Sequence, residues 1–488
     1  MRKFTLRIIL SAFIFSSYSV HAQAPDTAWT KTIGGLGNDN GRWIQETSDG
    51  GFIITGITAS SGAGQNDAWL IKTDSDGISQ WMQTYGGSNQ DYGFTVQQSQ
   101  EGNYTIGGQT LSFGSGGMDA WLIKTDAQGI TAWTKTYGTN VYELGYGARQ
   151  TLDGGYIICS QTSASGAGAL DIWLIKADSL GEIEWTQTYG GSDNDWGRFA
   201  QQTSDSGYVI LGQTESYGAG GYDLYVIKTS MDGDTVWTNT YGGMSSDYTA
   251  SMQQTSEGGY VILATSPMFS AGGHDAWLIK TDANGDTLWT RAYGGAEQED
   301  GYFILQTSDG GYILTGATLS YGNGGRDVFV VRVNALGDTL WTKTIGGTGD
   351  EIGYCIQETQ DGGYIIVGQT DSYGAGGDDL WLIKLDPEPA GISSAKNPAA
   401  PEAHSLYQNY PNPFNPTTRI SWRLPVSGPV KLTIYDLTGK TIVTLLDGWY
   451  PAGAHAVEWD ASNLASGVYL YRLHTDHFAQ TRKMLLLR

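Results

Sequence analysis

A tryptophan recurs every 52 residues along most of the chain, and this spacing constrains the fold more than any other feature. The tryptophans stand at Trp29, Trp81, Trp133, Trp185, Trp237, Trp289 and Trp341. The segment around Trp289 is typical of a β-hairpin, because a turn with Asn284-Gly285 separates two strand candidates, 277–280 and 288–293. Asparagine and glycine tolerate the positive φ that a hairpin reversal needs. Seven copies of one unit therefore indicate a repeat architecture.

Each unit contains four strand candidates. In the second unit they are residues 81–85, 92–98, 104–110 and 120–124. The third and fourth are nearly continuous apolar runs, which indicates a sheet covered on both faces. Seven such sheets predict an all-β fold, a seven-bladed β-propeller over residues 29–386. An open β-solenoid is the alternative, but its end units need polar caps, and the first unit is as apolar as the others.

The predicted blades are offset from the sequence repeat. The Asn-Gly type of turn joins the fourth strand of one unit to the tryptophan strand of the next, which makes the tryptophan strand outermost. The last unit, ending at Leu385, then lacks an outer strand, and residues 29–33 are expected to supply it. Short turns fall on one face of the ring and longer loops on the other. Binding is expected on the long-loop face, because long, variable loops carry most binding sites.

Two acidic positions recur in all seven units. An aspartate precedes each fourth strand and is expected to cap the glycine loop before it. A second carboxylate precedes each innermost strand, so in a closed ring seven carboxylates encircle the mouth of the central channel. They either bind loop amides or form a cation site, for which Ca²⁺ is the candidate ion because it prefers oxygen ligands. These candidate ligand-binding residues are Asp39, Asp91, Glu143, Asp195, Asp247, Glu299 and Glu351.

Aromatic residues follow three of these carboxylates. Tyr92, Trp196 and Tyr248 differ from the residues at the same position in the other units. Exposed aromatic rings stack on sugars or on peptide side chains, so these three are candidate ligand contacts. The alternative is that they pack on neighbouring loops.

Charge and motif content exclude several functions. The net charge is −23, with the excess of carboxylates in the repeats, so the chain is expected to repel nucleic acid. Cys159 and Cys355 occupy different positions in their units, which predicts no disulfide framework. The repeats hold a single histidine, His274, and the sequence shows no nucleophile elbow or phosphate-binding loop. No catalytic residue is therefore assigned.

The two ends of the chain differ from the repeats. Residues 1–22 combine Arg2 and Lys3 with the short apolar run 8–15, which predicts a cleaved signal peptide and no transmembrane segment in the mature chain. Residues 387–403 are rich in Pro, Ala and Ser and are expected to be a linker. Residues 404–488 alternate short strands with turns, which predicts a small β-sandwich.

Motifs in this last segment resemble a known family. They are Asn-Tyr-Pro-Asn-Pro-Phe-Asn-Pro at 409–416, Tyr-Asp-Leu-Thr-Gly at 435–439, Ser-Gly-Val-Tyr at 466–469 and a basic, apolar final strand. Their order is similar to that of the type IX secretion sorting domain. The resemblance implies contact with a secretion machinery, export across a bacterial outer membrane, and a place on the cell surface or outside the cell.

The sequence thus favours an exported, non-catalytic binding or adhesion module for a glycan or a cell-surface protein. A secreted carbohydrate-active hydrolase or lyase that uses propeller carboxylates is one alternative. A structural surface component is another.

Overall fold

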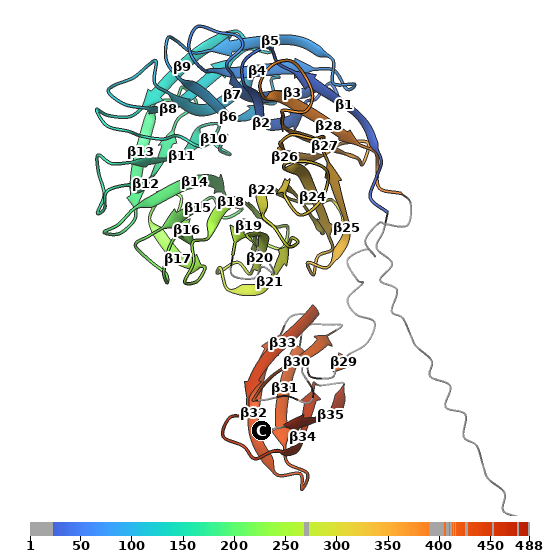
Figure 1. Ribbon diagram of the computed structural model, residues 1–488. Helices are drawn as coiled ribbons and strands as arrows, with labels where there is room; N and C mark the ends of the chain where they lie inside the picture. Colours follow the sequence, from blue (N-terminus) through green and yellow to red (C-terminus); the bar gives the residue numbers. More distant parts are fainter. Residues whose placement is uncertain are drawn as a thin grey trace, which may run out of the picture. The chain divides into compact units, whose positions relative to one another are not determined.

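Seven four-stranded antiparallel sheets form a ring in the computed structural model (Figure 1). The structure describes residues 23–267, 273–389 and 405–486, the last range with gaps at 407–408, 410–411, 413, 415, 425–427, 451–452 and 476–477. The predicted signal peptide, 1–22, lies outside the described residues, as does 390–403 of the predicted linker. The chain divides into two units, Met1–Ile392 and Ser393–Arg488. The predicted all-β, seven-bladed propeller is confirmed for the first unit.

The blades follow one another along the chain, and the innermost strand is written first in each. Blade 1 is β2 (Asp39–Glu46), β3 (Phe52–Thr58), β4 (Asp67–Thr73) and β5 (Ser79–Tyr85); blade 2 is β6 (Asp91–Gln98), β7 (Tyr104–Thr110), β8 (Asp119–Thr125) and β9 (Thr131–Tyr137); blade 3 is β10 (Gly147–Gln150), β11 (Tyr156–Thr162), β12 (Asp171–Ala177) and β13 (Ile183–Tyr189). Blade 4 is β14 (Asp195–Gln202), β15 (Tyr208–Thr214), β16 (Asp223–Thr229) and β17 (Thr235–Tyr241); blade 5 is β18 (Tyr248–Gln254), β19 (Tyr260–Ser266), β20 (Asp275–Thr281) and β21 (Thr287–Tyr293). Blade 6 is β22 (Glu299–Gln306), β23 (Tyr312–Thr318), β24 (Asp327–Val333) and β25 (Thr339–Ile345); blade 7 is β26 (Glu351–Glu358), β27 (Tyr364–Thr370), β28 (Asp379–Leu385) and β1 (Thr27–Ile33).

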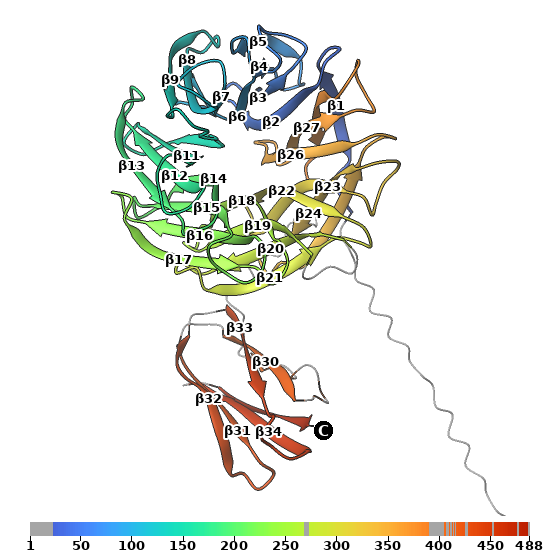
Figure 2. The same cartoon turned by 60° about the vertical axis from the view of Figure 1, so that its left-hand side comes forward.

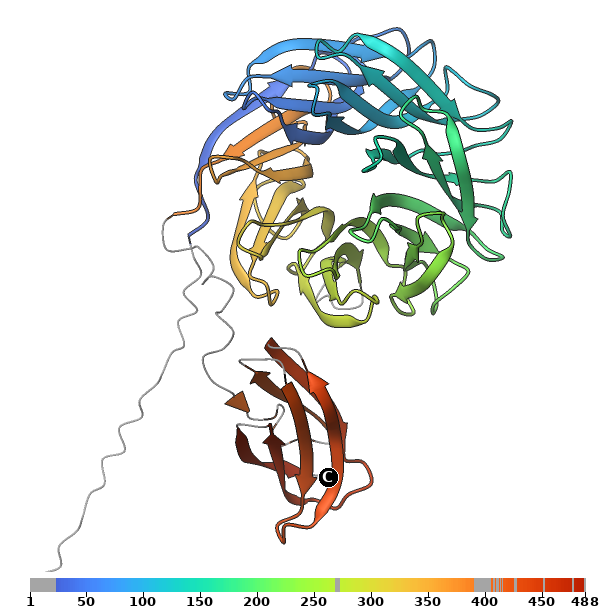
Figure 3. The ribbon, with the colours of Figure 1, turned by 180° about the vertical axis from the view of Figure 1, so that it is seen from behind.

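Residues from the start of the chain complete blade 7, as predicted. β1 pairs antiparallel with β28, from Trp29 opposite Lys384 to Ile33 opposite Leu380. Figure 3 shows this blue strand beside the orange end of the propeller. The amide of Asp386 also donates to the carbonyl of Asp26 at 2.9 Å. The first and last strands of the propeller are therefore held in one sheet.

The recurring tryptophan joins each blade to the next one. Trp81 on the outer strand β5 packs against Tyr104 of blade 2, with ring centroids 5.8 Å apart, and the other six junctions repeat this contact. At the closing junction Trp29 meets Phe52, with centroids 6.4 Å apart. The tryptophan is thus the packing residue between neighbouring sheets, which explains its 52-residue period.

One face of the ring carries the turns between the first and second strands, and the other carries the longer loops. The middle strands, such as β3 and β4, are buried at every residue. The outer strand β5 alternates exposed and half-buried residues. Figure 2 shows the inner strands converging on the centre of the ring. Those strands therefore carry the side chains nearest to the axis.

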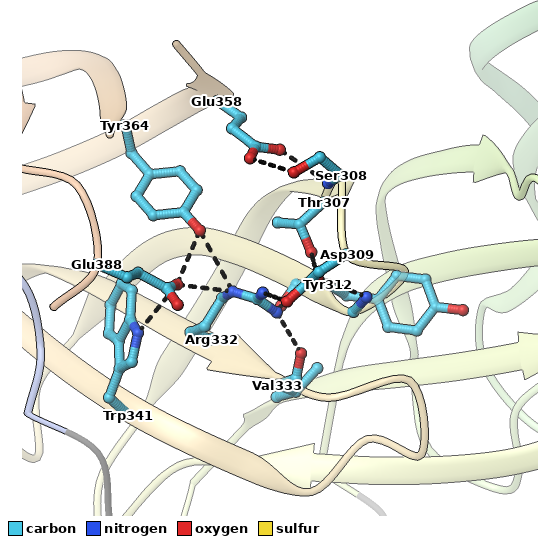
Figure 4. Close-up of polar contacts among 11 residues, drawn as sticks. Thr307, Ser308, Asp309, Tyr312, Arg332, Val333, Trp341, Glu358, Tyr364 and Glu388 are labelled. Carbon is cyan, nitrogen blue, oxygen red and sulfur yellow. Dashed lines mark hydrogen bonds and ion pairs between the residues drawn. The ribbon is translucent and has the colours of Figure 1, made fainter. Parts of the chain in front are cut away.

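The end of the propeller chain is fixed by Glu388, just after β28 (Figure 4). Its Oε1 accepts hydrogen bonds from Arg332 Nε at 2.9 Å, Tyr364 Oη at 2.8 Å and Trp341 Nε1 at 3.2 Å. Arg332 replaces the lysine of the other six units, and its Nη2 also pairs with Asp309. Because arginine presents several donors in one plane, it bonds two carboxylates at once.

The second unit consists of two sheets around a core of its own. One sheet has the order β29 (Ser405–Leu406), β30 (Thr417–Leu424) and β33 (Gly453–Asp460); the other has β32 (Thr441–Tyr450), β31 (Gly428–Tyr435), β34 (Gly467–His474) and β35 (Ala479–Leu486). Ile420 and Trp422 from the first sheet share a buried cluster with Leu432 and Tyr471 from the second. Two sheets that enclose one core form the expected small β-sandwich.

Candidate functional site

The seven carboxylates that precede the inner strands are buried beneath the long-loop face. Each is 0% exposed. Asp91 is representative: its Oδ2 accepts from the amide of Gly87 at 2.8 Å and from Ser112 Oγ at 2.6 Å, and its Oδ1 accepts from Thr110 Oγ1. These bonds join the connection from blade 1 to blade 2 with the loop between β7 and β8. In this conformation the carboxylates position the loops, and most of the side chains above them are at least partly accessible.

The second set of recurring aspartates caps the glycine loops, as expected. Asp119 Oδ2 accepts from the amide of Ser115 at 2.7 Å, while its Oδ1 is buried without a hydrogen-bond partner. That Oδ1 points toward Gly138, where a side chain has no room. Burial, and to a smaller extent the charge of Glu143 in blade 3, raise the pKa of Asp119 to about 6, although the hydrogen bond from Ser115 lowers it. Two like charges therefore meet at this blade junction.

The same pairing recurs around the ring. At Gly86, a side chain would meet Asp67 Oδ1 of blade 1 and Asp91 Oδ2 of blade 2, both within 3 Å of its Cβ. The pKa of Asp67 is raised as well, mainly by burial, although backbone amides oppose the shift. Among the described residues no group of three or more His, Cys, Asp and Glu side chains is placed to hold a metal ion. At six of the seven junctions the equivalent glycine thus lies against two carboxylate groups, one from each blade.

Replacing Asp119 with asparagine should stabilise the propeller at neutral pH. A raised pKa in the folded chain means that this group stabilises the fold most below about pH 4 and that the contribution is lost as the pH rises through 6. Asparagine keeps an acceptor for Ser115 and removes the charge that burial and Glu143 disfavour. We expect Asp119→Asn to gain about 1–2 kcal/mol at pH 7.5 and nothing at pH 4, in urea unfolding followed by tryptophan fluorescence.

Asp49→Asn is the matched control. Burial raises the pKa of Asp49, but hydrogen bonds from Thr47 and Lys72 outweigh it and lower this pKa to about 2. Its contribution is present above about pH 4 and is lost as the pH falls through 2, so this variant should be less stable than the wild type at pH 7.5. An Asp119→Asn variant destabilised equally at both pH values contradicts the paired-carboxylate interpretation.

Above the buried carboxylates, fourteen side chains encircle the axis, and we call them the belt. The belt consists of the residue after each inner-strand carboxylate and the residue before each loop-capping aspartate. A backbone hydrogen bond at every junction places the two sets side by side; that of Asp247 N to Tyr222 O measures 2.7 Å, and that of Asp39 N to Asp378 O closes the circle at 2.6 Å. The belt residues are Asn40, Asn66, Tyr92, Met118, Leu144, Leu170, Trp196, Tyr222, Tyr248, His274, Asp300, Arg326, Ile352 and Asp378.

The belt differs in chemistry around the ring. Over blades 4 and 5, Trp196, Tyr222, Tyr248 and His274 form a continuous aromatic arc with successive centroid distances of 4.9, 6.1 and 5.9 Å. Tyr248 is 42% exposed. Over blade 6, Arg326 forms an ion pair of 3.5 Å with Asp300. The carboxylates below are present in every blade, whereas the belt changes from blade to blade.

A second tier lies two residues further along each inner strand. Tyr92 stacks on Phe94, Phe94 stacks on Tyr146, and the guanidinium of Arg198 lies 4.5 Å above the Tyr146 ring. On the other side of the ring Arg42 lies 4.0 Å above Tyr354. The whole tier is Arg42, Phe94, Tyr146, Arg198, Ala250, Tyr302 and Tyr354.

The sequence analysis identified Tyr92, Trp196 and Tyr248 but missed their neighbours. Tyr222 and His274 lie outside the inner strands, just before the third strands β16 and β20, and only the folding of each blade brings them beside Trp196 and Tyr248. The second tier carries a signal that the repeat alignment contains, namely aromatic or arginine side chains at six of seven equivalent positions. Arginine above an aromatic ring is a favourable contact, and it leaves the donors at the edge of the guanidinium available.

Comparison with known proteins identifies the second unit. Residues 408–487 match the model of the secretion system C-terminal sorting domain. The chain is therefore exported by the type IX route to the cell surface or the extracellular space, and its tail interacts with the secretion machinery. In the part of the chain that the structure describes, no helix is long and apolar enough to cross a membrane.

Similarities to the propeller are weaker. The regulatory protein FlaEY of Caulobacter vibrioides is 26% identical over 160 residues, which cover 27% of this chain and 16% of that protein. A crystal structure of puromycin hydrolase is 12% identical with a TM-score of 0.47. The match covers 79% of this chain and 58% of the hydrolase chain. The β-propeller domain of the Trilobed protease from Pyrococcus furiosus is 10% identical with a TM-score of 0.38. The match covers 73% of this chain and 94% of that domain.

Proposed function

We propose that the exported propeller is a non-catalytic binding module that engages a glycan or a cell-surface protein through the belt on its long-loop face. The observation that carries this proposal is the aromatic arc of Trp196, Tyr222, Tyr248 and His274. In a ring whose buried framework is nearly constant, the arc is a local departure from the repeat. Selection for folding alone does not require it.

The chemistry of the arc suits sugar rings and amphipathic peptide segments. Aromatic faces stack on the C–H faces of sugars, and the tyrosine hydroxyl and imidazole groups at the edges supply hydrogen bonds. The rings contact one another in edge-to-face or tilted arrangements, so they are held in place before a ligand arrives. Such rigidity lowers the entropic cost of binding.

The seven inner-strand carboxylates have an indirect part in this proposal. Asp39, Asp91, Glu143, Asp195, Asp247, Glu299 and Glu351 hold the loops that present the belt, and their burial keeps them from direct contact with a ligand in the closed loop conformation. A hydrolase that uses two of them needs those loops to open. The experiment below distinguishes such an enzyme from a non-catalytic binding module.

The test is a screen of the mature chain against glycans and surface extracts, with and without Ca²⁺, followed by titration of any hit. We expect saturable binding that Trp196→Ala and Tyr222→Ala each weaken by about tenfold or more, because a central aromatic anchor typically contributes over 1.4 kcal/mol. Leu152→Ala, which truncates an exposed apolar residue on the short-turn face, is the control and should bind like the wild type.

Three outcomes contradict the proposal. Release of product from any bound glycan assigns the chain to the carbohydrate-active enzymes. Binding that is equally strong in Trp196→Ala, Tyr222→Ala and the wild type moves the site away from the belt. Concentration-dependent self-association that the two variants abolish, with no other ligand found, indicates a structural surface component.

A further inference from the structure

Arg149 is a cation inside the ring that does not belong to the belt. It lies on the inner strand β10, five residues beyond the belt residue Leu144, which corresponds to about 16 Å along an extended strand. At the same position five other units carry glutamine and one carries leucine: Gln45, Gln97, Gln201, Gln253, Leu305 and Gln357. Arg149 therefore departs from the repeat just as the aromatic arc does, but deeper along the inner strand.

The glutamines at this position have a structural task that arginine cannot perform. Gln45 Oε1 accepts from the amide of Gln98 in the next blade at 2.8 Å, and Gln253 Oε1 accepts from that of Gln306 at 2.8 Å. Arginine has no acceptor atom, so the junction between blades 3 and 4 lacks this bond. The replacement removes a framework contact without supplying an equivalent one.

The guanidinium of Arg149 lies at the centre of the ring. Its Cζ is 4.7 Å from the ring centroid of Trp43 on β2 and 4.9 Å from that of Phe199 on β14. These strands belong to blades 1 and 4, and blade 2 separates blade 1 from blade 3. Reaching Trp43 therefore requires the side chain to extend into the axis. Trp43 is itself in edge contact with Phe303 of blade 6, with centroids 5.1 Å apart.

The charge of Arg149 has no counter-ion. Most buried cations of the propeller bond a carboxylate: Lys72 pairs with Asp49 at 3.0 Å, Lys384 with Asp361 at 2.9 Å and Arg332 with two acids. Within the described residues no Asp or Glu forms such a pair with Arg149, and its Nε is buried without a hydrogen-bond partner. Burial lowers the pKa of its guanidinium to about 10, so it remains charged at neutral pH. The residue as a whole keeps partial contact with solvent.

We propose that Arg149 is an oxyanion-binding site at the ring axis, which takes a carboxylate or sulfate group of an acidic ligand. The Trp43 and Phe199 rings hold the guanidinium in place by cation–π contacts. Its edge then presents parallel N–H donors that match two oxygens of one anion. The anion supplies the missing counter-ion in a chain whose own net charge is −23. This proposal does not rest on the belt, because Arg149 lies five residues beyond Leu144 along the chain.

The experiment compares the mature wild-type chain with Arg149→Gln, which restores the residue found in five other units. Thermal midpoints and calorimetric titrations are measured in sodium sulfate and in sodium galacturonate, against sodium chloride at matched ionic strength. We expect a saturable rise of the wild-type midpoint with either anion and at least a tenfold weaker response in Arg149→Gln. A response to sulfate alone or to galacturonate alone identifies which oxyanion the site takes.

Arg291→Gln is the control, since Arg291 is exposed, lies over a tryptophan ring and has a carboxylate neighbour in Asp338. It should respond to the anions like the wild type. An equal response in Arg149→Gln and the wild type overturns the proposal, because the effect is then a general one of salt. A wild-type chain that responds to neither anion overturns it as well, and a lowered midpoint of Arg149→Gln then assigns Arg149 to packing.

Discussion

Deletion of residues 23–33 should open the propeller and lower its thermal midpoint by about 10 °C or more, since each 1 kcal/mol lost shifts a large domain by about 2–4 °C. The deletion removes β1, which is the outer strand of blade 7. The backbone groups of β28 that pair with residues 27–33 then become a free sheet edge. Trp29 is lost with them, and with it the packing against Phe52 that joins blade 7 to blade 1.

Two further hydrogen bonds fix the residues just before β1 to the propeller. Lys343 Nζ donates to the carbonyl of Pro25 at 2.8 Å, and the amide of Asp386 donates to the carbonyl of Asp26. Ala24, Trp29 and Ile33 also pack on the buried cluster that links blades 1, 6 and 7. Because an exposed, apolar sheet edge pairs with other chains, we expect the deletion variant to aggregate as well.

Size-exclusion chromatography with light scattering and thermal unfolding measure the effect. A shorter deletion, 23–26, is the control, because it removes the contacts of Pro25 and Asp26 but leaves β1 in place. This control should lower the thermal midpoint much less than the longer deletion. Adding a synthetic peptide of residues 23–33 to the longer deletion should restore part of the midpoint. A longer deletion that stays monomeric with an unchanged midpoint shows that the ring does not depend on β1.

The sequence was sufficient to predict the ring and its closure. A strict 52-residue period, hairpin turns at Asn284-Gly285 and its equivalents, and doubly covered strands leave few other folds. The offset between repeat and blade follows from those turns, and it led directly to the pairing of residues 29–33 with β28. These features are local or periodic, so they are visible without coordinates.

The site was predicted less completely, for a physical reason. A carboxylate recurs at the position of Asp195 in every unit because it holds loops. The burial of Asp195 depends on how Ser216 and the loop after residue 214 fold over it. Recurrence within a repeat therefore identified the framework, not the surface that varies above it. Tyr222 joins Trp196 only through contacts that the folded loops create. The position of Arg149 beside Trp43 likewise depends on the closed ring, since their blades are not neighbours.

Removal of residues 390–488 should retain the protein in the periplasm of a host with a type IX secretion system. Residues 408–487 form the sorting domain, and this unit has its own buried core, which includes Trp422 and Leu432. Among the described residues, the buried clusters of the propeller draw only on the first unit. A chain that ends at residue 389 also keeps Glu388 in its bonds with Arg332 and Tyr364. The truncated propeller should therefore fold normally while losing its route across the outer membrane.

Cell fractionation and surface proteolysis measure this effect, and they are expected to show at least a tenfold loss of surface and extracellular protein. Thermal unfolding of the purified truncated chain provides the folding control, since an unchanged midpoint excludes misfolding as the cause. The reciprocal control fuses residues 390–488 to an unrelated periplasmic protein, which should then leave the periplasm. Truncated propeller found at the surface in normal amounts means that the repeats themselves carry an export signal, whereas a fusion protein that stays in the periplasm means that residues 390–488 are not sufficient for export.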